Sequence, residues 1–300
     1  MISLFPDDRV LRFCFLPLRG KIALVTGASG GIGLITAREL ARRGARVIMV
    51  CRNPERGEQA RTAIRAAIGS DAQLDLLLCD LSLIANVRTL AEEVTRRFDR
   101  LDILVNNAGI FPGPLTITEE GHELSWATNH LAVFALTNLL LPQLLEAPQA
   151  RILTVASEAH WLGEIELSAE ARNAREKYSS FTAYCDSKLA NIMFTSELAH
   201  RLDLTKVTAN CLHPGMVDTG LVNPGSSTLM KAMWWTARPF MIIPEKGAQT
   251  SIYLASSPEV EGVSGKYFKN RKPSRASGRS QSRPEAARLW RLSQEETGIE

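Results

Sequence analysis

Six short apolar runs alternate with helix-like segments between residues 22 and 212 of this 300-residue chain. The runs occupy residues 22–26, 45–51, 74–79, 101–105, 151–155 and 207–212. The segments between them have the apolar spacing of helices and lie at residues 34–43, 55–68, 84–98, 123–141 and 184–202. Near-continuous apolar runs are typical of strands covered on both faces, and helical crossovers join parallel strands. The pattern therefore predicts the α/β class, with a single doubly wound parallel sheet and helices on both faces.

The charge balance excludes a chain-wide surface for nucleic acid. The 35 Lys and Arg residues against 32 Asp and Glu leave a formal net charge of +3, whereas nucleic-acid-binding domains are strongly basic. Residues 269–283 are a local exception, with six Lys or Arg and no acid. Their Ser, Gly and Pro content predicts an exposed or disordered segment.

Cysteine and histidine spacing indicates neither a disulfide framework nor a metal site. The five cysteines are odd in number, widely spaced and never in a C-x-x-C pair: Cys14, Cys51, Cys79, Cys185 and Cys211. No two of the five histidines stand at i, i+4 spacing. We therefore expect buried free thiols in a reducing compartment, and no metal.

The sequence predicts no signal peptide and no transmembrane helix. Charged residues interrupt the apolar N-terminus, and the uncharged run 13–18 is far shorter than the ~20 residues that span a bilayer. Residues 124–145 lack Asp, Glu, Lys and Arg but contain Asn129, His130 and Pro142, so we expect a buried core helix there. The expected location of the protein is cytoplasmic.

A glycine-rich turn, T-G-A-S-G-G-I-G at residues 26–33, directly follows the first apolar run and opens the first helix. Such a turn lets the backbone approach a pyrophosphate closely, and the helix N-terminus supplies N–H donors and the positive end of a dipole. Its position between strand and helix predicts a dinucleotide site in a Rossmann-type fold. A plain tight turn is the alternative for the glycines alone.

The ends of the second and third predicted strands bear on the choice of cofactor. Residues 51–53 read C-R-N and contain no acid, whereas NAD sites present a carboxylate to the ribose here and an arginine can bind a 2′-phosphate. Arg52 therefore favours NADP(H) over NAD(H), with a solvated surface arginine as the alternative. Asp80 is a candidate partner of the adenine, with an ordinary cap as the alternative.

Tyr184 and Lys188 form the only Tyr–Lys pair at i, i+4 spacing. That spacing puts the phenol and the ammonium on one helix face, where the ammonium would lower a phenol pKa of about 10. Ser157 follows the fifth run and N-N-A-G at 106–109 ends the fourth, so both are expected at the carboxyl edge of the sheet, where ligands bind. The pair is therefore a candidate acid/base unit, with a core tyrosine and a surface lysine as the alternative.

In chain order the motifs are T-G-x-x-x-G-x-G, N-N-A-G, a strand-end serine, Y-x-x-x-K and the H-P-G turn at 213–215. This series resembles the short-chain dehydrogenase/reductase family, and the likeness runs from about residue 20 to 268. Within that family the sequence resembles the retinol dehydrogenase-like group, in the segments A-R-V-I-M-V-C-R-N at 45–53 and S-E-A-H at 157–160. The first glycine spacing disfavours the sugar-nucleotide epimerases, which also use Y-x-x-x-K.

The resemblance implies a role for each matching position. Tyr184 would exchange a proton with the substrate oxygen, and Lys188 would lower the pKa of Tyr184 and bind the nicotinamide ribose. Ser157 would hold the substrate oxygen, and Asn129 would support a water path to Lys188. The residues implied at the cofactor are Gly27, Ser29, Gly31, Ile32, Gly33, Arg52, Asp80, Leu81, Asn106, Ala108, Tyr184, Lys188, Pro214, Gly215, Val217 and Thr219.

Four positions depart from the family pattern. Ala156 stands in place of the first serine of the usual serine pair, which should be harmless because the second serine is the catalytic one in family members. Ser29 stands where close relatives often carry asparagine, and Gly30 and Leu34 lack the basic residues that some NADP-dependent members place around this loop. The prediction of NADP(H) therefore rests mainly on Arg52.

These observations predict an NADP(H)-dependent oxidoreductase that transfers hydride between the nicotinamide and a carbonyl or alcohol carbon. A Met- and Trp-rich insertion at residues 221–243 follows the H-P-G turn and could close over the site. We therefore expect a lipophilic substrate such as a retinoid, a steroid or a long-chain aldehyde. Packing of the insertion against the core or a second subunit is the alternative.

Other readings are left open by the sequence. The rival function is a non-catalytic NADP-binding sensor or scaffold. Trp234, Trp235 and the basic segment could meet an anionic membrane surface, and a homo-oligomer is not excluded. The predicted organisation is an N-terminal extension at 1–19, a dehydrogenase domain at 20–268 that includes the insertion, and a basic segment with a C-terminal helix at 269–300.

Overall fold

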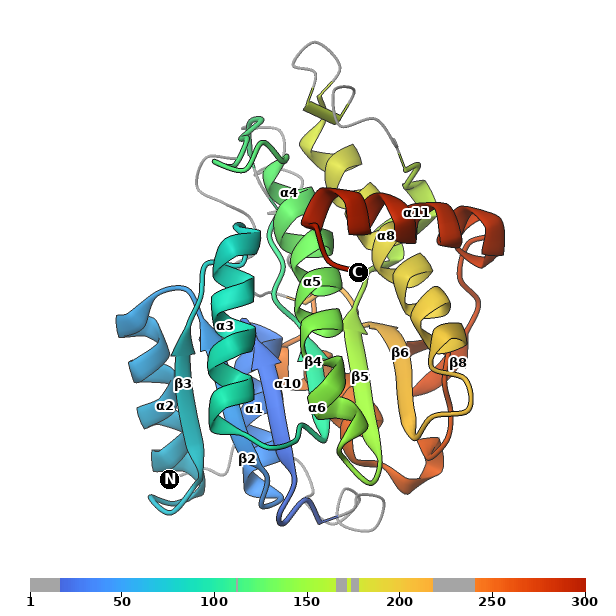
Figure 1. The fold of residues 1–300 in the computed structure, drawn as a ribbon. Coiled ribbons are helices and arrows are strands. Elements are labelled where there is room, and N and C mark those ends of the chain that lie inside the picture. The colour runs from blue at the N-terminus through green and yellow to red at the C-terminus, as the bar shows by residue number, and fades with distance from the viewer. Residues whose placement is uncertain (1–16, 112, 166–171, 174–177, 218–240) are drawn as a thin grey trace.

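The computed structural model describes residues 17–111, 113–165, 172–173, 178–217 and 241–300 (Figure 1). Most of the predicted insertion at 221–243, with Trp234 and Trp235, lies outside these residues. Thr219, Cys14 and most of the N-terminal extension also lie outside them.

Eight strands form one sheet in the order β3-β2-β1-β4-β5-β6-β7-β8. Neighbouring strands are parallel, except that β8 runs antiparallel to β7. The strands are β1 (Ile22–Thr26), β2 (Arg46–Cys51), β3 (Leu74–Leu78), β4 (Ile103–Asn106), β5 (Ala150–Val155), β6 (Val207–His213), β7 (Tyr267–Lys269) and β8 (Lys272–Ser274). The strand order reverses between β1 and β4, which is where open α/β sheets bind their ligands. The predicted α/β class with one doubly wound sheet is confirmed.

Helices cover both faces of this sheet (Figure 1). One face is packed by α1, α2 and α10, and the other by α3, α5 and α8. The α-helices are α1 (Gly31–Arg42), α2 (Pro54–Ile68), α3 (Ile84–Arg97), α4 (Leu124–Trp126), α5 (Ala132–Leu139), α6 (Leu141–Leu145), α8 (Ser180–Arg201), α10 (Pro244–Ser256) and α11 (Arg283–Thr297). All five predicted helical segments are present, whereas α10, β7 and β8 have no counterpart in the predicted pattern.

The predicted helix at 123–141 is not one regular α-helix. A π-helical turn, η1 (Ala127–Leu131), separates α4 from α5. Residues 125–137 are buried, so the prediction of a core helix in this region is confirmed. Single π-turns often occur at functional sites, and η1 contains Asn129.

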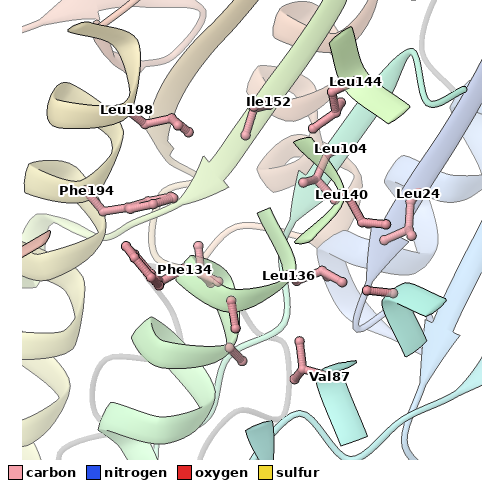
Figure 2. Packing of buried hydrophobic residues seen from close by; sticks show 14 of the residues in the cluster. Leu24, Val87, Leu104, Phe134, Leu136, Leu140, Leu144, Ile152, Phe194 and Leu198 are labelled. Atoms are coloured by element: carbon pink, nitrogen blue, oxygen red, sulfur yellow. The ribbon is translucent and has the colours of Figure 1, made fainter. Parts of the chain in front are cut away.

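The larger of the two main hydrophobic clusters lies under α3, α5 and α8 (Figure 2). Phe134 of α5 meets Phe194 of α8 edge to face, with 5.7 Å between ring centroids. Trp290 of α11 stacks on Phe194, also at 5.7 Å. The C-terminal helix therefore shares the core that supports α5 and α8.

The basic residues 269–283 were predicted to be exposed or disordered, and most of them are exposed. They are ordered, however, by the β7–β8 hairpin and by a short 3₁₀ turn, η6 (Arg279–Gln281). Ser277 and Ser280 within the segment are buried. The alternative of a disordered segment is therefore wrong, because hairpin pairing and buried serines fix this part of the chain.

The described residues contain neither a membrane-spanning helix nor a metal-ligand cluster, and their cysteines are buried. No helix among them is long and apolar enough to cross a membrane. They contain no group of three or more side chains suited to hold a metal ion. The described cysteines are buried free thiols, as expected: Cys51, Cys79, Cys185 and Cys211.

Candidate active site

The glycine-rich turn joins β1 to α1 and leaves the helix N-terminus free for an anion. The N-cap, Gly30, makes no side-chain cap hydrogen bond, and the first turn of α1 contains no acid. A Cβ on Gly33 would lie 2.3 Å from the carbonyl oxygen of Gly27, whose own φ is +67°. Because only glycine fits both positions, the turn has the tight form that lets a backbone approach a pyrophosphate.

Thr26 and Asn107 join the ends of β1 and β4 beside this turn. The Thr26 hydroxyl accepts hydrogen bonds from the N–H groups of Asn107 and Ala108, each at 2.9 Å. The Asn107 side chain donates to the Thr26 carbonyl at 2.8 Å. Asn106 is turned the other way: its side chain is buried and donates to Thr137 of α5 at 2.9 Å. The amide nitrogen of Asn106 is therefore occupied, whereas its side-chain oxygen is buried without a hydrogen-bond partner.

Two arginines lie near the glycine-rich turn. Arg52 is exposed and directly follows β2, the strand beside β1. Asn53 then caps α2 by accepting a hydrogen bond from the Arg56 N–H at 2.8 Å. The Arg56 guanidinium lies 3.6 Å from the position that a Cβ would take on Gly30. Sequence analysis missed Arg56, although its place four residues after Arg52 was a usable signal.

Asp80 and Leu81 follow β3. One carboxylate oxygen of Asp80 accepts hydrogen bonds from the N–H and the hydroxyl of Ser82, at 3.0 and 2.8 Å. This is the capping role that stood as the alternative for Asp80. Leu81 packs in the larger hydrophobic cluster.

Asn129, on the π-turn η1, is fully buried and connects the loop after β4 to α8. Its side chain accepts from the Ile110 N–H at 2.8 Å and donates to the Ile110 carbonyl at 3.0 Å. Its amide also donates to the Ser187 hydroxyl at 3.0 Å, and Ser187 donates to the carbonyl of Tyr184 at 2.8 Å. Asn129 therefore fixes the backbone that carries the candidate catalytic tyrosine.

Tyr184 lies in the second turn of α8 and is hydrogen-bonded to Ser157. Ser157 follows β5 and caps a 3₁₀ turn, η2 (Glu158–Leu162), because its hydroxyl accepts from the Ala159 N–H at 3.2 Å. The ring of Phe111 packs on Tyr184 with 5.0 Å between centroids. Phe111 was missed by sequence analysis, since nothing in its spacing indicates this contact.

Lys188 is buried below Tyr184. Its ammonium lies 5.6 Å from the centre of the Tyr184 ring and donates to the Val155 carbonyl at 3.1 Å. Burial lowers the pKa of Lys188 to about 8.

The pKa of Tyr184 differs from expectation. Burial raises it to about 12, and the hydrogen bond with Ser157 offsets only part of that rise. Lys188, whose ammonium donates to the Val155 carbonyl, is not among the groups that shift this pKa, so the expected lowering of the Tyr184 pKa by Lys188 stays a prediction.

The H-P-G sequence begins at His213, the last residue of β6. Pro214 and Gly215 are partly buried, and Gly215 has a φ of +95°. Val217 is buried in a small cluster with Ile32 of α1 and Ile252 of α10. Ile32 and Val217 therefore join the glycine-rich turn to the chain after β6.

Four predicted catalytic residues meet in one place: Asn129, Ser157, Tyr184 and Lys188. Among the predicted cofactor residues, the glycines of the turn, Ser29, Ile32 and Ala108 lie around the start of α1 and the end of β4. Internal hydrogen bonds use one carboxylate oxygen of Asp80 and the amide nitrogen of Asn106, while the Asn106 side-chain oxygen is buried without a partner. His160 and His213, which the sequence analysis did not assign, contact the backbone at Ser157 and Glu158.

Comparison with known proteins agrees with this arrangement. The family model for short chain dehydrogenases matches residues 21–229. Retinol dehydrogenase 14 of Mus musculus is 42% identical over 296 residues, which cover 94% of this chain and 87% of that protein. Retinol dehydrogenase 12 of Homo sapiens is 42% identical over 285 residues, with 94% and 88% covered.

Solved structures have the same fold. An uncharacterized protein from Mycobacterium paratuberculosis superposes with a TM-score of 0.76 at 35% identity, covering 95% of this chain and 96% of that one. A protein described as a short chain dehydrogenase from Shigella flexneri 2a, complexed with NADP, gives 0.66 at 26% identity, with 85% and 99% covered. This chain therefore belongs to the short-chain dehydrogenase/reductase family and is similar, over nearly its whole length, to the retinol dehydrogenases.

Proposed function

We propose that this oxidoreductase uses NADP(H) to interconvert the carbonyl and alcohol forms of a lipophilic substrate such as a retinoid, a steroid or a long-chain aldehyde. The observation that carries the proposal is the meeting of Ser157, Tyr184 and Lys188 at the carboxyl edge of the sheet. When bound, the nicotinamide supplies or accepts the hydride.

The residues around α1 fit a dinucleotide. Its pyrophosphate would lie against the uncapped N-terminus of α1, where glycines 27 and 33 leave no side chain in the way. The ribose and nicotinamide would extend toward Lys188 and the Pro214–Gly215 turn. Asp80 would approach the adenine only through the carboxylate oxygen that Ser82 does not use.

Tyr184 and Ser157 would hold the substrate oxygen. With a pKa near 12 the Tyr184 phenol keeps its proton at neutral pH, so in the reducing direction it can donate that proton to the carbonyl oxygen. The Ser157 hydroxyl, which already bonds Tyr184, would donate to the same oxygen. The Lys188 ammonium would then favour the phenolate that is left.

Gly109 lies against both Asn129 and Lys188. A Cβ at Gly109 would stand 3.3 Å from the Lys188 ammonium and 3.4 Å from the Asn129 side-chain oxygen. A side chain here would crowd the two groups that the proposed water path to Lys188 would join.

A lipophilic substrate is supported by the apolar residues near Tyr184. Phe111 packs on the Tyr184 ring, and Phe181 lies one helical turn before it and is 41% exposed. Trp161 and Leu162, just after Ser157, are 54% and 68% exposed. Exposed side chains of this size beside polar catalytic groups suit a ligand with a long apolar part.

The test is nicotinamide absorbance during incubation with NADPH or NADH and a panel of retinal, long-chain aldehydes, steroid ketones and small carbonyls. Faster oxidation of NADPH with a lipophilic member of the panel is the expected result. Tight NADPH binding without turnover on any member would instead favour the sensor or scaffold function.

The preference for NADP(H) is expected to depend on Arg52 and Arg56. A guanidinium paired with a 2′-phosphate is a charge-assisted contact, so Arg52→Ala should raise the KM for NADPH about 10-fold and leave that for NADH within about threefold. Arg56→Ala should act in the same direction. Arg65→Ala, at the far end of α2, is the matched control. An equal effect of Arg52→Ala on both cofactors would contradict the assignment.

Peripheral contact with an anionic membrane belongs to the same proposal. Trp161 and Leu162 are exposed beside Arg279, whose guanidinium contacts the Gly163 carbonyl at 3.4 Å. Apolar and basic side chains together suit an anionic lipid surface. Sedimentation with phosphatidylserine vesicles at low salt, lost in Trp161→Ser with Arg279→Ala, is the expected result, and no sedimentation of the unaltered protein would exclude the contact.

A further inference from the structure

One peptide bond directly after Ser157 is held by a histidine on each side. The Ser157 carbonyl lies 2.7 Å from Nδ1 of His160. The N–H of the same peptide, on Glu158, donates to Nδ1 of His213 at 3.2 Å. His160 is in η2 and His213 ends β6, so the two rings reach this peptide from different elements.

The partners of the two rings require opposite tautomers. Nε2 of His160 accepts a hydrogen bond from the Ser277 N–H at 3.1 Å, so its proton must be on Nδ1, where it can donate to the Ser157 carbonyl. Nδ1 of His213 is an acceptor, so its proton is on Nε2, which lies 3.5 Å from a carboxylate oxygen of Glu158. A second proton on either ring would occupy the nitrogen that accepts the backbone hydrogen bond, and that bond would be lost.

Both rings are buried, and burial keeps them neutral. It lowers the pKa of His160, although the Ser157 carbonyl and Glu158 act against this. It lowers the pKa of His213 to about 4, with Lys269 and His160 acting in the same direction and Glu158 against it. Glu158 is itself ion-paired with Lys269, which lowers the pKa of its carboxyl group.

The held peptide determines where the Ser157 hydroxyl points. That hydroxyl accepts from the N–H of Ala159, two residues on, and is also the partner of Tyr184. A rotation of the 157–158 peptide would turn the following backbone and take the Ala159 donor away. The hydroxyl would then be free to leave the position that faces the substrate oxygen.

We propose that His160 and His213 are positioning residues that hold the 157–158 peptide and, through it, the hydroxyl of Ser157. This rests on the proposed function, in which Ser157 holds the substrate oxygen. The segment 267–277 takes part, because Ser277 fixes His160, the ring of Tyr267 packs on His160 at 5.1 Å, and Lys269 pairs with Glu158. Segment 267–277 therefore supports the backbone after Ser157, although it lies outside the strand that Ser157 follows.

The tautomers can be measured without any turnover. A ¹H–¹⁵N correlation spectrum of the imidazole nitrogens of the full chain at pH 7, assigned by loss of signals in His160→Phe and His213→Phe, reports where each proton lies. The expected result is Nδ1–H for His160 and Nε2–H for His213. The same tautomer on both rings, or a charged ring, overturns the proposal even if the enzyme is active.

Kinetics test the consequence for Ser157. His160→Phe keeps a ring but no hydrogen bond and should lower kcat about 10-fold with the NADPH Kd unchanged, since a small displacement of a catalytic group costs that much. His160→Asn places an amide donor at the position of Nδ1 and should recover kcat to within about threefold. The control is His200→Phe, because His200 is exposed in the last turn of α8 and takes no part in holding the 157–158 peptide. Equal loss of kcat in His160→Phe and His160→Asn overturns the proposal.

A failure of the proposed function can be distinguished from a failure of this inference. If the unaltered protein turned over no substrate with either cofactor, the role of Ser157 would fall, while the imidazole spectrum would still decide whether the two histidines hold the peptide.

Discussion

Replacing Tyr184 by phenylalanine is expected to lower kcat by about 10³-fold, within the range measured for loss of a positioned proton donor. The phenol is the group that we expect to give a proton to a carbonyl oxygen held by Ser157, and its raised pKa keeps that proton in place at pH 7. The Kd of NADPH should change little, because the ring that packs on Phe111 is retained.

The matched control is Tyr178→Phe. Tyr178 also carries a partly buried phenol, which donates to Glu123 at 3.0 Å, but it does not contact Ser157 or Lys188 in the described residues. This variant should lose some stability and keep kcat within about threefold, because a single hydrogen bond contributes about 1 kcal/mol. Single-turnover absorbance separates the two variants, and more than a tenth of the original kcat in Tyr184→Phe would contradict the assigned role.

The sheet was predictable because its strands are covered on both faces. The run at 22–26 is apolar and matches β1 (Ile22–Thr26) residue for residue, since no solvent face interrupts it. Strands β7 and β8 span three residues each, too short for any period to be recognised. They form because β7 pairs with the edge of β6 and β8 then pairs with β7. This pairing depends on the assembled sheet and cannot be seen in the local sequence.

The candidate catalytic residues were predictable for a topological reason. Ser157 and the N-N-A-G motif each follow a parallel strand, so both must arrive at the same edge. The contacts of Phe111, Arg56 and His160 depend instead on how loops pack across that edge. The direction of the Tyr184 pKa was also beyond the sequence, because i, i+4 spacing gives the distance to an ammonium but not the depth of burial.

Introducing a methyl group at Gly33 is expected to raise the Kd of NADPH about 100-fold, which corresponds to about 2.7 kcal/mol. The new Cβ would stand 2.3 Å from the Gly27 carbonyl oxygen and 2.4 Å from the Asn107 amide nitrogen. Both are held by the network between Thr26 and β4, so the turn must open to admit the methyl group. Opening moves the N–H donors of α1 away from the pyrophosphate they would bind.

Quenching of protein fluorescence by NADPH measures this loss, with Gly278→Ala as the control. A Cβ at Gly278 meets nothing within 4 Å and its φ is −56°, so that variant should bind NADPH as the unaltered protein does. Gly33→Ala should also unfold at a lower temperature, because the strain is present without cofactor. A lower unfolding temperature with an unchanged Kd would mean that the turn supports the fold and does not hold the cofactor. A raised Kd in a folded variant would tie the tight fit of Gly33 against Gly27 directly to binding of the pyrophosphate.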